Sequence, residues 1–242
     1  MPYEATLPVF TADDAAAEIN ARFAPKDACG VIAHALTARG RIALVSSFGA
    51  ESVVLLHMAA AVDRAVPVLF VETGMLFAET LSYQRRVAER LGLSNVRIVR
   101  PDPVQLLTRD TDGLLHQSDT DACCTLRKVE PLANALLPYD GWISGRKRIH
   151  GGQRIELELA EAEGERLKLN PLAHWSGTEI AAYMEAHDLP RHPLTAKGYG
   201  SIGCAPCTRA ARPGEAPRAG RWPGQDKTEC GIHFIDGKAV RP

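Results

Sequence analysis

The stretch RIALVSSFGAES, residues 41–52, sets the interpretation of the whole chain. Residues 41–48 form an apolar run rich in strand-forming residues, so they predict a β-strand. Residues 51–62, ESVVLLHMAAAV, have the length and apolar spacing of a helix. A strand that passes through a short loop into a helix is the basic unit of an α/β fold.

The same alternation recurs further along the chain. Apolar runs predict three more strands, and amphipathic or apolar segments between them predict helices. Because the strand runs are nearly all apolar, both faces of the sheet should be covered. The pattern predicts an α/β fold with a doubly wound, mostly parallel sheet, with strands at 41–48, 66–73, 96–101 and 141–146 and helices at 77–92 and 121–137.

The two ends of the chain differ from this middle part. Helices at 13–23 and 29–40 should precede the first strand. Residues 166–172 predict an edge strand, followed by a helix that begins at Ser176 or Thr178. Beyond it the chain becomes rich in proline, glycine and charge. We therefore expect an N-terminal helical segment 1–40, an α/β domain 41–208 and a flexible C-terminal tail 209–242.

The composition excludes several classes of function. The 242 residues are 45% hydrophobic and 24% charged, which predicts a packed core. A net charge of -1 offers nothing to attract nucleic acid or an anionic membrane. No apolar run approaches the roughly 20 residues of a membrane span, and the first residues lack the pattern of a secretory signal. The expected location is the cytoplasm, where structural disulfides are rare.

The loop after the first strand is a candidate anion site. Small residues at 46–52 leave backbone N–H groups open at a helix N-terminus, which suits a phosphate group. The alternative is an ordinary tight turn with Ser47 or Ser52 as the helix cap. Residues 71–77, VETGMLF, end the next strand and should line a nucleotide pocket beside this loop.

The cysteines are the most informative residues. In a reducing compartment they are metal ligands or catalytic thiols rather than disulfides, although Cys29 fits a small buried side chain in a helix. Two pairs have ligand-like spacing, Cys123–Cys124 and Cys204–Cys207. Adjacent residues on a helix diverge by roughly 100°, so they reach one small ion poorly and separate corners of a cluster better. Spacing favours an iron–sulfur cluster, with structural zinc and thiol redox chemistry as alternatives.

Basic residues surround these cysteines. The segment GRKRIHGGQR, residues 145–154, is cationic and leaves the fourth predicted strand. The tail adds Arg209, Arg212, Arg218 and Arg221 before Cys230. Cations suit a polyanionic ligand and lower the pKa of a nearby thiol, which would make Cys230 a nucleophile. His233 would pair with that thiol or with the ligand.

Several of these segments together resemble one family. SSFGAES, CCTLRKVEPL, SIGCAPCTR, GRW and ECGIH occur in the order found in the iron–sulfur branch of the phosphoadenylyl-sulfate reductase family, which includes the assimilatory adenylyl-sulfate reductases. The resemblance extends from about residue 40 to 235. It implies a fold related to the adenine nucleotide α-hydrolases and a homo-oligomer.

The resemblance also implies roles for individual residues. A [4Fe–4S] cluster would bind to Cys123, Cys124, Cys204 and Cys207, and would position and polarise the substrate rather than pass electrons. Lys128 would lie between cluster and substrate, Cys230 would be the nucleophile, and His233 is the histidine of the terminal motif. The substrate-binding residues would be Ser46, Ser47, Phe48, Gly49, Gly145, Arg154, Arg218 and Arg221.

The implied reaction is the reduction of adenosine 5'-phosphosulfate. Cys230 would take the sulfonate group and release AMP, and thioredoxin or glutaredoxin would then release sulfite. Where the family commonly has G-x-R-R-[DE]-Q-S-x-x-R, this chain reads GRKRIHGGQR, so Arg154 is the least secure match. VETG stands for the frequent L-D-T-G, and Ile232 for a leucine.

Two other interpretations remain open at this level. The substrate could be the 3'-phosphorylated nucleotide, or both nucleotides could react. In a non-enzymatic alternative, the chain is a zinc-stabilised nucleotide-binding module.

Overall fold

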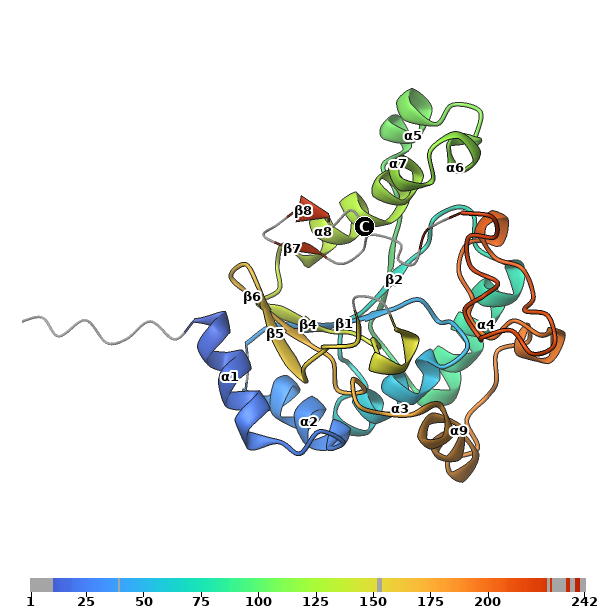
Figure 1. The fold of residues 1–242 in the computed structure, drawn as a ribbon. Coiled ribbons are helices and arrows are strands. Elements are labelled where there is room, and N and C mark those ends of the chain that lie inside the picture. The colour runs from blue at the N-terminus through green and yellow to red at the C-terminus, as the bar shows by residue number, and fades with distance from the viewer. Residues whose placement is uncertain are drawn as a thin grey trace, which may run out of the picture.

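The computed structural model of the chain describes residues 11–38, 40–151, 154–225 and 227, together with the backbone of residues 234–235 and 238–239. Strands and helices alternate through the body of the molecule (Figure 1). The strands are β1 (Ile42–Ser46), β2 (Val68–Val71), β3 (Val96–Val99), β4 (Gly141–Ile143), β5 (Ala160–Glu163), β6 (Arg166–Leu169), β7 (Phe234–Ile235) and β8 (Lys238–Ala239). The longer helices are α1 (Ala12–Arg22), α2 (Ala28–Ala38), α3 (Ser52–Val62), α4 (Ala78–Leu91), α5 (Pro103–Arg109), α8 (Glu130–Leu136) and α9 (Gly177–Ala186). The short helical segments are α6 (Leu115–Ser118), α7 (Thr120–Cys124), η1 (Thr125–Val129), η2 (Arg148–His150), η4 (Thr195–Lys197) and η5 (Ala205–Cys207).

The main sheet has the order β3-β2-β1-β4-β6-β5. All its pairs are parallel except β5 with β6, so the prediction of a mostly parallel α/β sheet is confirmed. The prediction that residues 166–172 form an edge strand is wrong, because β6 lies between β4 and β5. The edge strand β5 has the sequence AEAE, whose residues have low strand propensity.

Both faces of the sheet are buried, as a doubly wound fold requires. Along β1, Leu44 packs in the larger cluster with α2, α3 and α4, whereas its neighbour Ala43 packs on the other face with α8. Phe70 and Leu69 of β2 divide in the same way. Successive side chains of a strand point to opposite faces, so a run of apolar residues can supply both cores.

The ends of several helices follow from local chemistry. Thr11 and Asp14 form a capping box at the start of α1. Ser176 and Glu179 do the same for α9, which confirms the predicted start of that helix at Ser176. Gly92, in the left-handed conformation with φ 67°, ends α4.

One prediction about the N-terminal helices is wrong. Cys29 lies in α2 as expected, but its side chain is exposed rather than buried. The buried face of α2 is formed by its neighbours Ala28, Val31, Ile32 and Ala35.

The helix that contains Cys123 and Cys124 has an irregular turn. The two cysteines end α7, and the next turn, η1, is π-helical. Turns of this kind are rare and occur frequently at functional sites. Pro131 lies in the first turn of α8, directly after the π-helical turn. The sequence predicts a helix here but not the π-helical turn.

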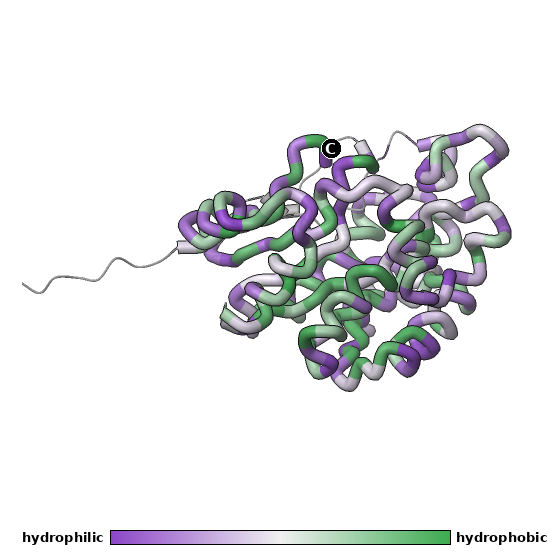
Figure 2. The backbone as a smooth tube through the Cα atoms, turned by 90° about the horizontal axis from the view of Figure 1, so that it is seen from below, coloured by the Kyte–Doolittle hydropathy of each residue, from purple (hydrophilic) through white to green (hydrophobic). Residues whose placement is uncertain are grey.

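The segment from α5 to α7 projects from the body of the molecule (Figure 1). Hydrophobic stretches of chain gather in the interior of the body, and hydrophilic stretches lie along its outer turns (Figure 2). Within the described part of the chain, no helix has the length and apolar character needed to cross a membrane.

Candidate active site

A cavity of about 250 Å³ opens at the carboxyl ends of β1, β2 and β4. Ser46 ends β1 and Ser47 follows it, Thr73 follows β2, and Ser144 and Gly145 follow β4, and all of these residues line the cavity. Parallel strands bring their carboxyl ends to the same edge of the sheet, where ligands of open α/β folds bind. The predicted loop residues therefore meet in one place.

Two serine hydroxyls accept hydrogen bonds from backbone N–H groups of the loop after β1. The Phe48 N–H donates to Ser46 Oγ at 3.1 Å, and the Gly49 N–H donates to Ser52 Oγ at 3.0 Å. Phe48 has a φ of 46° and is fully buried against Phe70, with the ring centroids 5.1 Å apart. The Phe48 side chain does not line the cavity, so any contact of this residue with a ligand is left to its backbone. The cap of α3 is neither Ser47 nor Ser52 but Glu51.

Basic side chains from three segments surround the cavity. They come from the π-helical turn, from the loop after β4 and from the C-terminal part of the chain. Their gathering in a pocket favours an anionic ligand. Among the described residues, those that line it are Lys128, Arg146, Lys147, Arg154, Arg218 and Arg221.

The loop after β4 is tied to the cavity wall by polar contacts. Lys147 is buried, and its Nζ lies 2.9 Å from Oε2 of Glu51. Arg154 Nη1 lies 3.1 Å from Nδ1 of His150. Burial, with the charges of Lys147, Arg154 and Arg218, lowers the pKa of His150 to about 3. His150 is therefore neutral at physiological pH, and its Nδ1 accepts a hydrogen bond from Arg154.

The two cysteine pairs meet beside this cavity. Cys123, Cys124 and Cys204 are buried, and Cys204 lines the cavity itself. Burial and the neighbouring Cys124 raise the pKa of Cys123 to about 12, and Cys204 adds to this effect. Burial and Cys204 likewise raise the pKa of Cys207. Cys123 thus interacts electrostatically with Cys124 and with Cys204, and Cys204 with Cys207, so the two pairs, 80 residues apart in sequence, lie near each other.

Comparisons with known proteins agree with this arrangement. Residues 41–210 match the model of the phosphoadenosine phosphosulfate reductase domain. The chain is 50% identical over 222 residues to adenosine 5'-phosphosulfate reductase of Chelativorans sp. (strain BNC1), covering 90% of this chain and 91% of that protein. It is 53% identical over 193 residues to the protein of the same name from Mesorhizobium japonicum, covering 80% and 76%.

The chain belongs to the phosphoadenosine phosphosulfate reductase family. A solved structure shares the fold: phosphoadenylyl-sulfate reductase from Candida auris superimposes with a TM-score of 0.66 at 24% identity, over 83% of this chain and 97% of that one. The predicted fold and family are confirmed.

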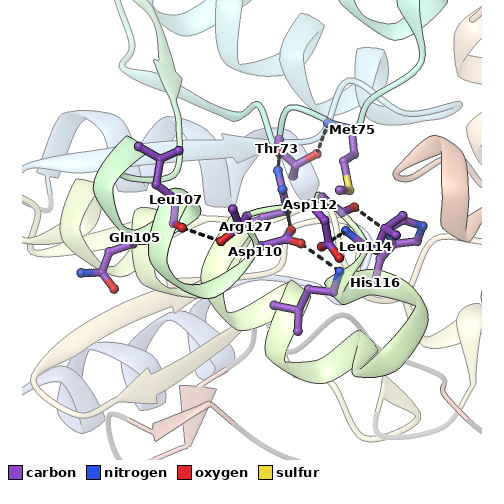
Figure 3. A network of polar contacts seen from close by, with 12 residues as sticks. Thr73, Met75, Gln105, Leu107, Asp110, Asp112, Leu114, His116 and Arg127 are labelled. Carbon is purple, nitrogen blue, oxygen red and sulfur yellow. Dashed lines mark hydrogen bonds and ion pairs between the residues drawn. The ribbon is translucent and has the colours of Figure 1, made fainter.

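In this reductase-family chain, a buried network connects the cysteine helix to the loop after β2 (Figure 3). Arg127 donates from Nε and Nη2 to Oδ2 of Asp110, at 3.0 and 2.6 Å. Its Nη1 donates to the Thr73 carbonyl oxygen at 2.9 Å. Thr73 Oγ1 lies 3.3 Å from Sγ of Cys204. Arg127 thus has partners of its own, and its charge opposes the rise in the pKa of Cys123 that burial and Cys124 cause.

The C-terminal part of the chain contributes two of its arginines to the cavity. Thr208 pairs with Arg221 in a β-bridge, and the Trp222 N–H donates to the Cys207 carbonyl at 3.0 Å, so residues 208–222 form a closed loop. Arg218 and Arg221 line the cavity, whereas Arg209 pairs with Glu215 at 2.8 Å and does not line it. Cys230 and His233 lie outside the described residues.

Sequence reasoning missed three residues of this region: Thr73, Asp110 and Glu51. Thr73 was contained in the predicted pocket segment VETG without a role of its own. Asp110 lies in the turn sequence RDTDG, which gives no sign that one carboxylate is buried. Glu51 could have been suspected, because a carboxylate in a predicted anion-binding loop conflicts with that role.

Proposed function

We propose that this protein reduces adenosine 5'-phosphosulfate to sulfite and AMP, with thioredoxin or glutaredoxin as the reductant, as a step of sulfate assimilation. The names of the two relatives with 50% and 53% identity support this substrate. The observation that carries the proposal is the composition of the cavity. A single pocket at the carboxyl end of the sheet is lined both by Cys204 and by basic residues from three segments.

The first step transfers the sulfonate group to the enzyme. The thiolate of Cys230 attacks the sulfur of the nucleotide, and the bond between that sulfur and the bridging phosphate oxygen breaks. AMP leaves with the electron pair, and Cys230 carries an S-sulfonate. Lys128, Arg154, Arg218 and Arg221 balance the charge that accumulates on the phosphate and sulfonate oxygens.

The second step uses the reductant. One thiolate of thioredoxin attacks Sγ of Cys230, and sulfite leaves with the electron pair of the broken S–S bond. The second thioredoxin thiol then attacks the mixed disulfide, which restores the Cys230 thiolate. The two electrons come from the thioredoxin dithiol. Cys230 follows Lys227 by three residues in the sequence, and Lys227 Nζ contacts Asp121 of α7, the helix that ends at Cys123 and Cys124.

The four thiols of the two cysteine pairs fit an iron–sulfur cluster. Thiolates are the ligands of such clusters, and three of these four are buried beside Arg127 and Lys128. Among the described residues, no three His, Cys, Asp or Glu side chains converge on a point where one metal ion would bind. Cys123 and Cys124 are adjacent on α7, so their thiols diverge and suit separate corners of a cluster better than a single zinc ion. The ligands would be Cys123, Cys124, Cys204 and Cys207, and the bound cluster would supply a field that polarises the substrate.

Mass spectrometry tests the proposed nucleophile. The protein is mixed with adenosine 5'-phosphosulfate in the absence of thioredoxin. We expect a sulfonate adduct on Cys230 together with stoichiometric AMP, and no adduct in Cys230→Ser. An adduct on another cysteine, or AMP release without an adduct, would contradict the assignment.

Metal analysis after anaerobic purification tests the cofactor. We expect about four iron and about four sulfide ions per chain, together with visible absorbance. In Cys207→Ser the iron content, the sulfide content and the absorbance should all be lower. A colourless protein with one zinc per chain would instead support the zinc-stabilised module.

A further inference from the structure

The loop after β4 contains a side-chain contact to which the proposed reaction gives no role. Arg154 Nη1 lies 3.1 Å from Nδ1 of His150, and both residues line the cavity. Arg154 is 8% exposed, and the His150 side chain is 20% exposed. His150 ends η2, so the contact ties the guanidinium group of Arg154 back to that helical turn.

The direction of this hydrogen bond follows from its donor. A guanidinium group donates hydrogen bonds and accepts none, so His150 Nδ1 must be the acceptor. A protonated imidazole could not accept, and a neutral one that accepts at Nδ1 carries its proton on Nε2. Nε2 lies 3.9 Å from Oε2 of Glu51, whose negative charge favours a proton on that nitrogen.

The groups that face His150 come from three parts of the chain. Lys147 and Arg154 belong to its own loop, Arg218 comes from the C-terminal part, and Glu51 comes from the start of α3. Burial and the three cations lower the pKa of His150 to about 3. The ring therefore stays neutral at physiological pH, as the hydrogen bond from Arg154 requires.

A neutral acceptor and a carboxylate hold an arginine with different consequences for a ligand. A carboxylate positions the guanidinium group but also offsets its charge, as Asp110 does for the buried Arg127. The imidazole of His150 positions the guanidinium group of Arg154 and adds no negative charge beside it. An anion in the cavity is then attracted by an arginine whose position is fixed.

We infer that His150 is a positioning residue, which holds the guanidinium group of Arg154 in the cavity as an uncharged hydrogen-bond acceptor. The inference rests on the proposed function, in which Arg154 balances charge on the phosphate and sulfonate oxygens of the nucleotide. His150 acts through Arg154, and this role requires no contact between His150 and the substrate.

The kinetics of sulfite release in three variants test the acceptor and its charge. His150→Leu removes the acceptor, so kcat/KM should fall roughly tenfold. His150→Asn supplies an amide oxygen near the position of Nδ1 and should restore most of this loss. His150→Asp has the shape of asparagine and adds a negative charge, so kcat/KM should fall roughly tenfold below that of His150→Asn. Equal values for the Leu and Asn variants, or for the Asn and Asp variants, would contradict the inference.

A double-mutant cycle separates positioning of Arg154 from a general effect on the fold. Arg154→Met removes the cation that His150 is inferred to hold. In that background, His150→Leu should change kcat/KM by less than about twofold, because its effect passes through Arg154. The same fall in both backgrounds would show that His150 acts independently of Arg154 and would overturn the inference.

A matched control comes from the same loop. Arg148 Nη2 lies 3.0 Å from Oε1 of the exposed Glu158, and neither residue lines the cavity. Glu158→Gln weakens this anchor of the loop, and kcat/KM should stay within about threefold of the wild type. A fall as large as that in His150→Leu would mean that any loosening of the loop has this effect, and the specific role of His150 would be refuted.

A binding measurement keeps the inference separate from the chemistry. Calorimetry with adenosine 5'-phosphosulfate in a Cys230→Ser background requires no sulfur transfer. Adding His150→Leu should raise Kd roughly tenfold, and adding His150→Asn should not. If the wild type releases no sulfite, the proposed function is refuted and this measurement decides the inference. Normal sulfite release by the wild type, with unchanged kinetics and affinity in His150→Leu, would refute the inference alone.

Discussion

Arg127 and Asp110 form a buried ion pair in which two guanidinium nitrogens donate to one carboxylate oxygen. The Arg127 side chain is 9% exposed and the Asp110 side chain is fully buried. Burial alone would raise the pKa of Asp110, but the Leu115 N–H and Arg127 hold it below its usual value. The pair joins the loop after α5 to the turn that follows Cys123 and Cys124.

We predict that Asp110→Asn destabilises the protein strongly. The substitution leaves the Arg127 charge buried without its carboxylate, and breaking a buried pair in this way costs about 3 kcal/mol. Urea unfolding of the anaerobically purified protein measures the change. Asp112→Asn is the matched control, because Asp112 is exposed and accepts a hydrogen bond from the Leu114 N–H. Similar unfolding midpoints for the two variants would contradict the importance of the buried pair.

Gly203 gives a prediction about substrate affinity. A Cβ at this position would lie 2.4 Å from Nη2 and 2.5 Å from Cζ of Arg221, which stacks 4.4 Å above the Trp222 ring. Gly203→Ala must therefore push the Arg221 guanidinium away from its place in the cavity. We expect KM for the nucleotide to rise roughly tenfold, because the substitution removes about one charge-assisted hydrogen bond to the substrate. The melting temperature should change little.

The control for this substitution is Gly177→Ala. A Cβ there meets only Ile149 Cδ1 at 3.9 Å, an ordinary van der Waals distance. KM should remain at the wild-type value. If both alanine variants bind the nucleotide as the wild type does, Arg221 does not contribute to binding from this position.

His192 makes the stability of the fold depend on pH. It is 1% exposed, its Nδ1 accepts from the Leu194 N–H at 3.2 Å, and its Nε2 lies 3.1 Å from Thr80 Oγ1. Burial is the main cause that lowers the pKa of His192 to about 4. The His192 imidazole is protonated near pH 6.5 in the unfolded chain and near pH 4 in the folded chain. The contribution of the buried, neutral imidazole to the free energy of unfolding is therefore complete above pH 6.5 and is lost as the pH falls from 6.5 through 4.

We predict that His192→Asn loses this pH dependence. The variant is less stable than the wild type at neutral pH, and the difference narrows by on the order of 3 kcal/mol between pH 7 and pH 4. Denaturant unfolding at a series of pH values measures it. A constant difference across that range would show that His192 titrates alike in both states.

The sequence predicts those elements of the fold whose pattern of apolar side chains has a single structural interpretation. The apolar runs of β1, β2 and β4 have one interpretation, because only a covered parallel sheet buries both faces of such strands. β5 was missed because its alternating Ala and Glu carry no apolar signal. The two-residue connection Gly164–Glu165 marks the hairpin, with φ 62° at Gly164, and places β6 inside the sheet.

The residues of the candidate site fall into the same two groups, those that a local sequence pattern predicts and those that it does not. The cysteine pairs are local in sequence, so spacing identified them as candidate ligands. The groups that hold them are not local: Arg127 reaches Asp110 in a preceding loop, and Thr73 reaches Cys204 across 131 residues. Such a pair follows no periodic or regularly spaced sequence pattern. Its contact can be recognised only in the structure, where the sheet brings the two loops together.

Lys128 gives the most direct test of the proposed chemistry. It lies in the π-helical turn, is 8% exposed and lines the cavity, and its charge opposes the rise in the pKa of Cys207 that burial and Cys204 cause. The positive charge of Lys128 therefore acts both on the thiols and on the cavity.

Lys128→Met keeps the length and apolar stem of the side chain and removes the charge. We expect kcat for sulfite release to fall at least about 100-fold, as for the loss of one group that stabilises developing charge. Melting temperature and iron content should be unchanged. Lys197→Met is the control, because Lys197 is exposed and pairs with Glu79 at 3.0 Å outside the cavity. Wild-type turnover in Lys128→Met would remove this lysine from the mechanism, whereas loss of iron would make it a residue of the thiol site instead.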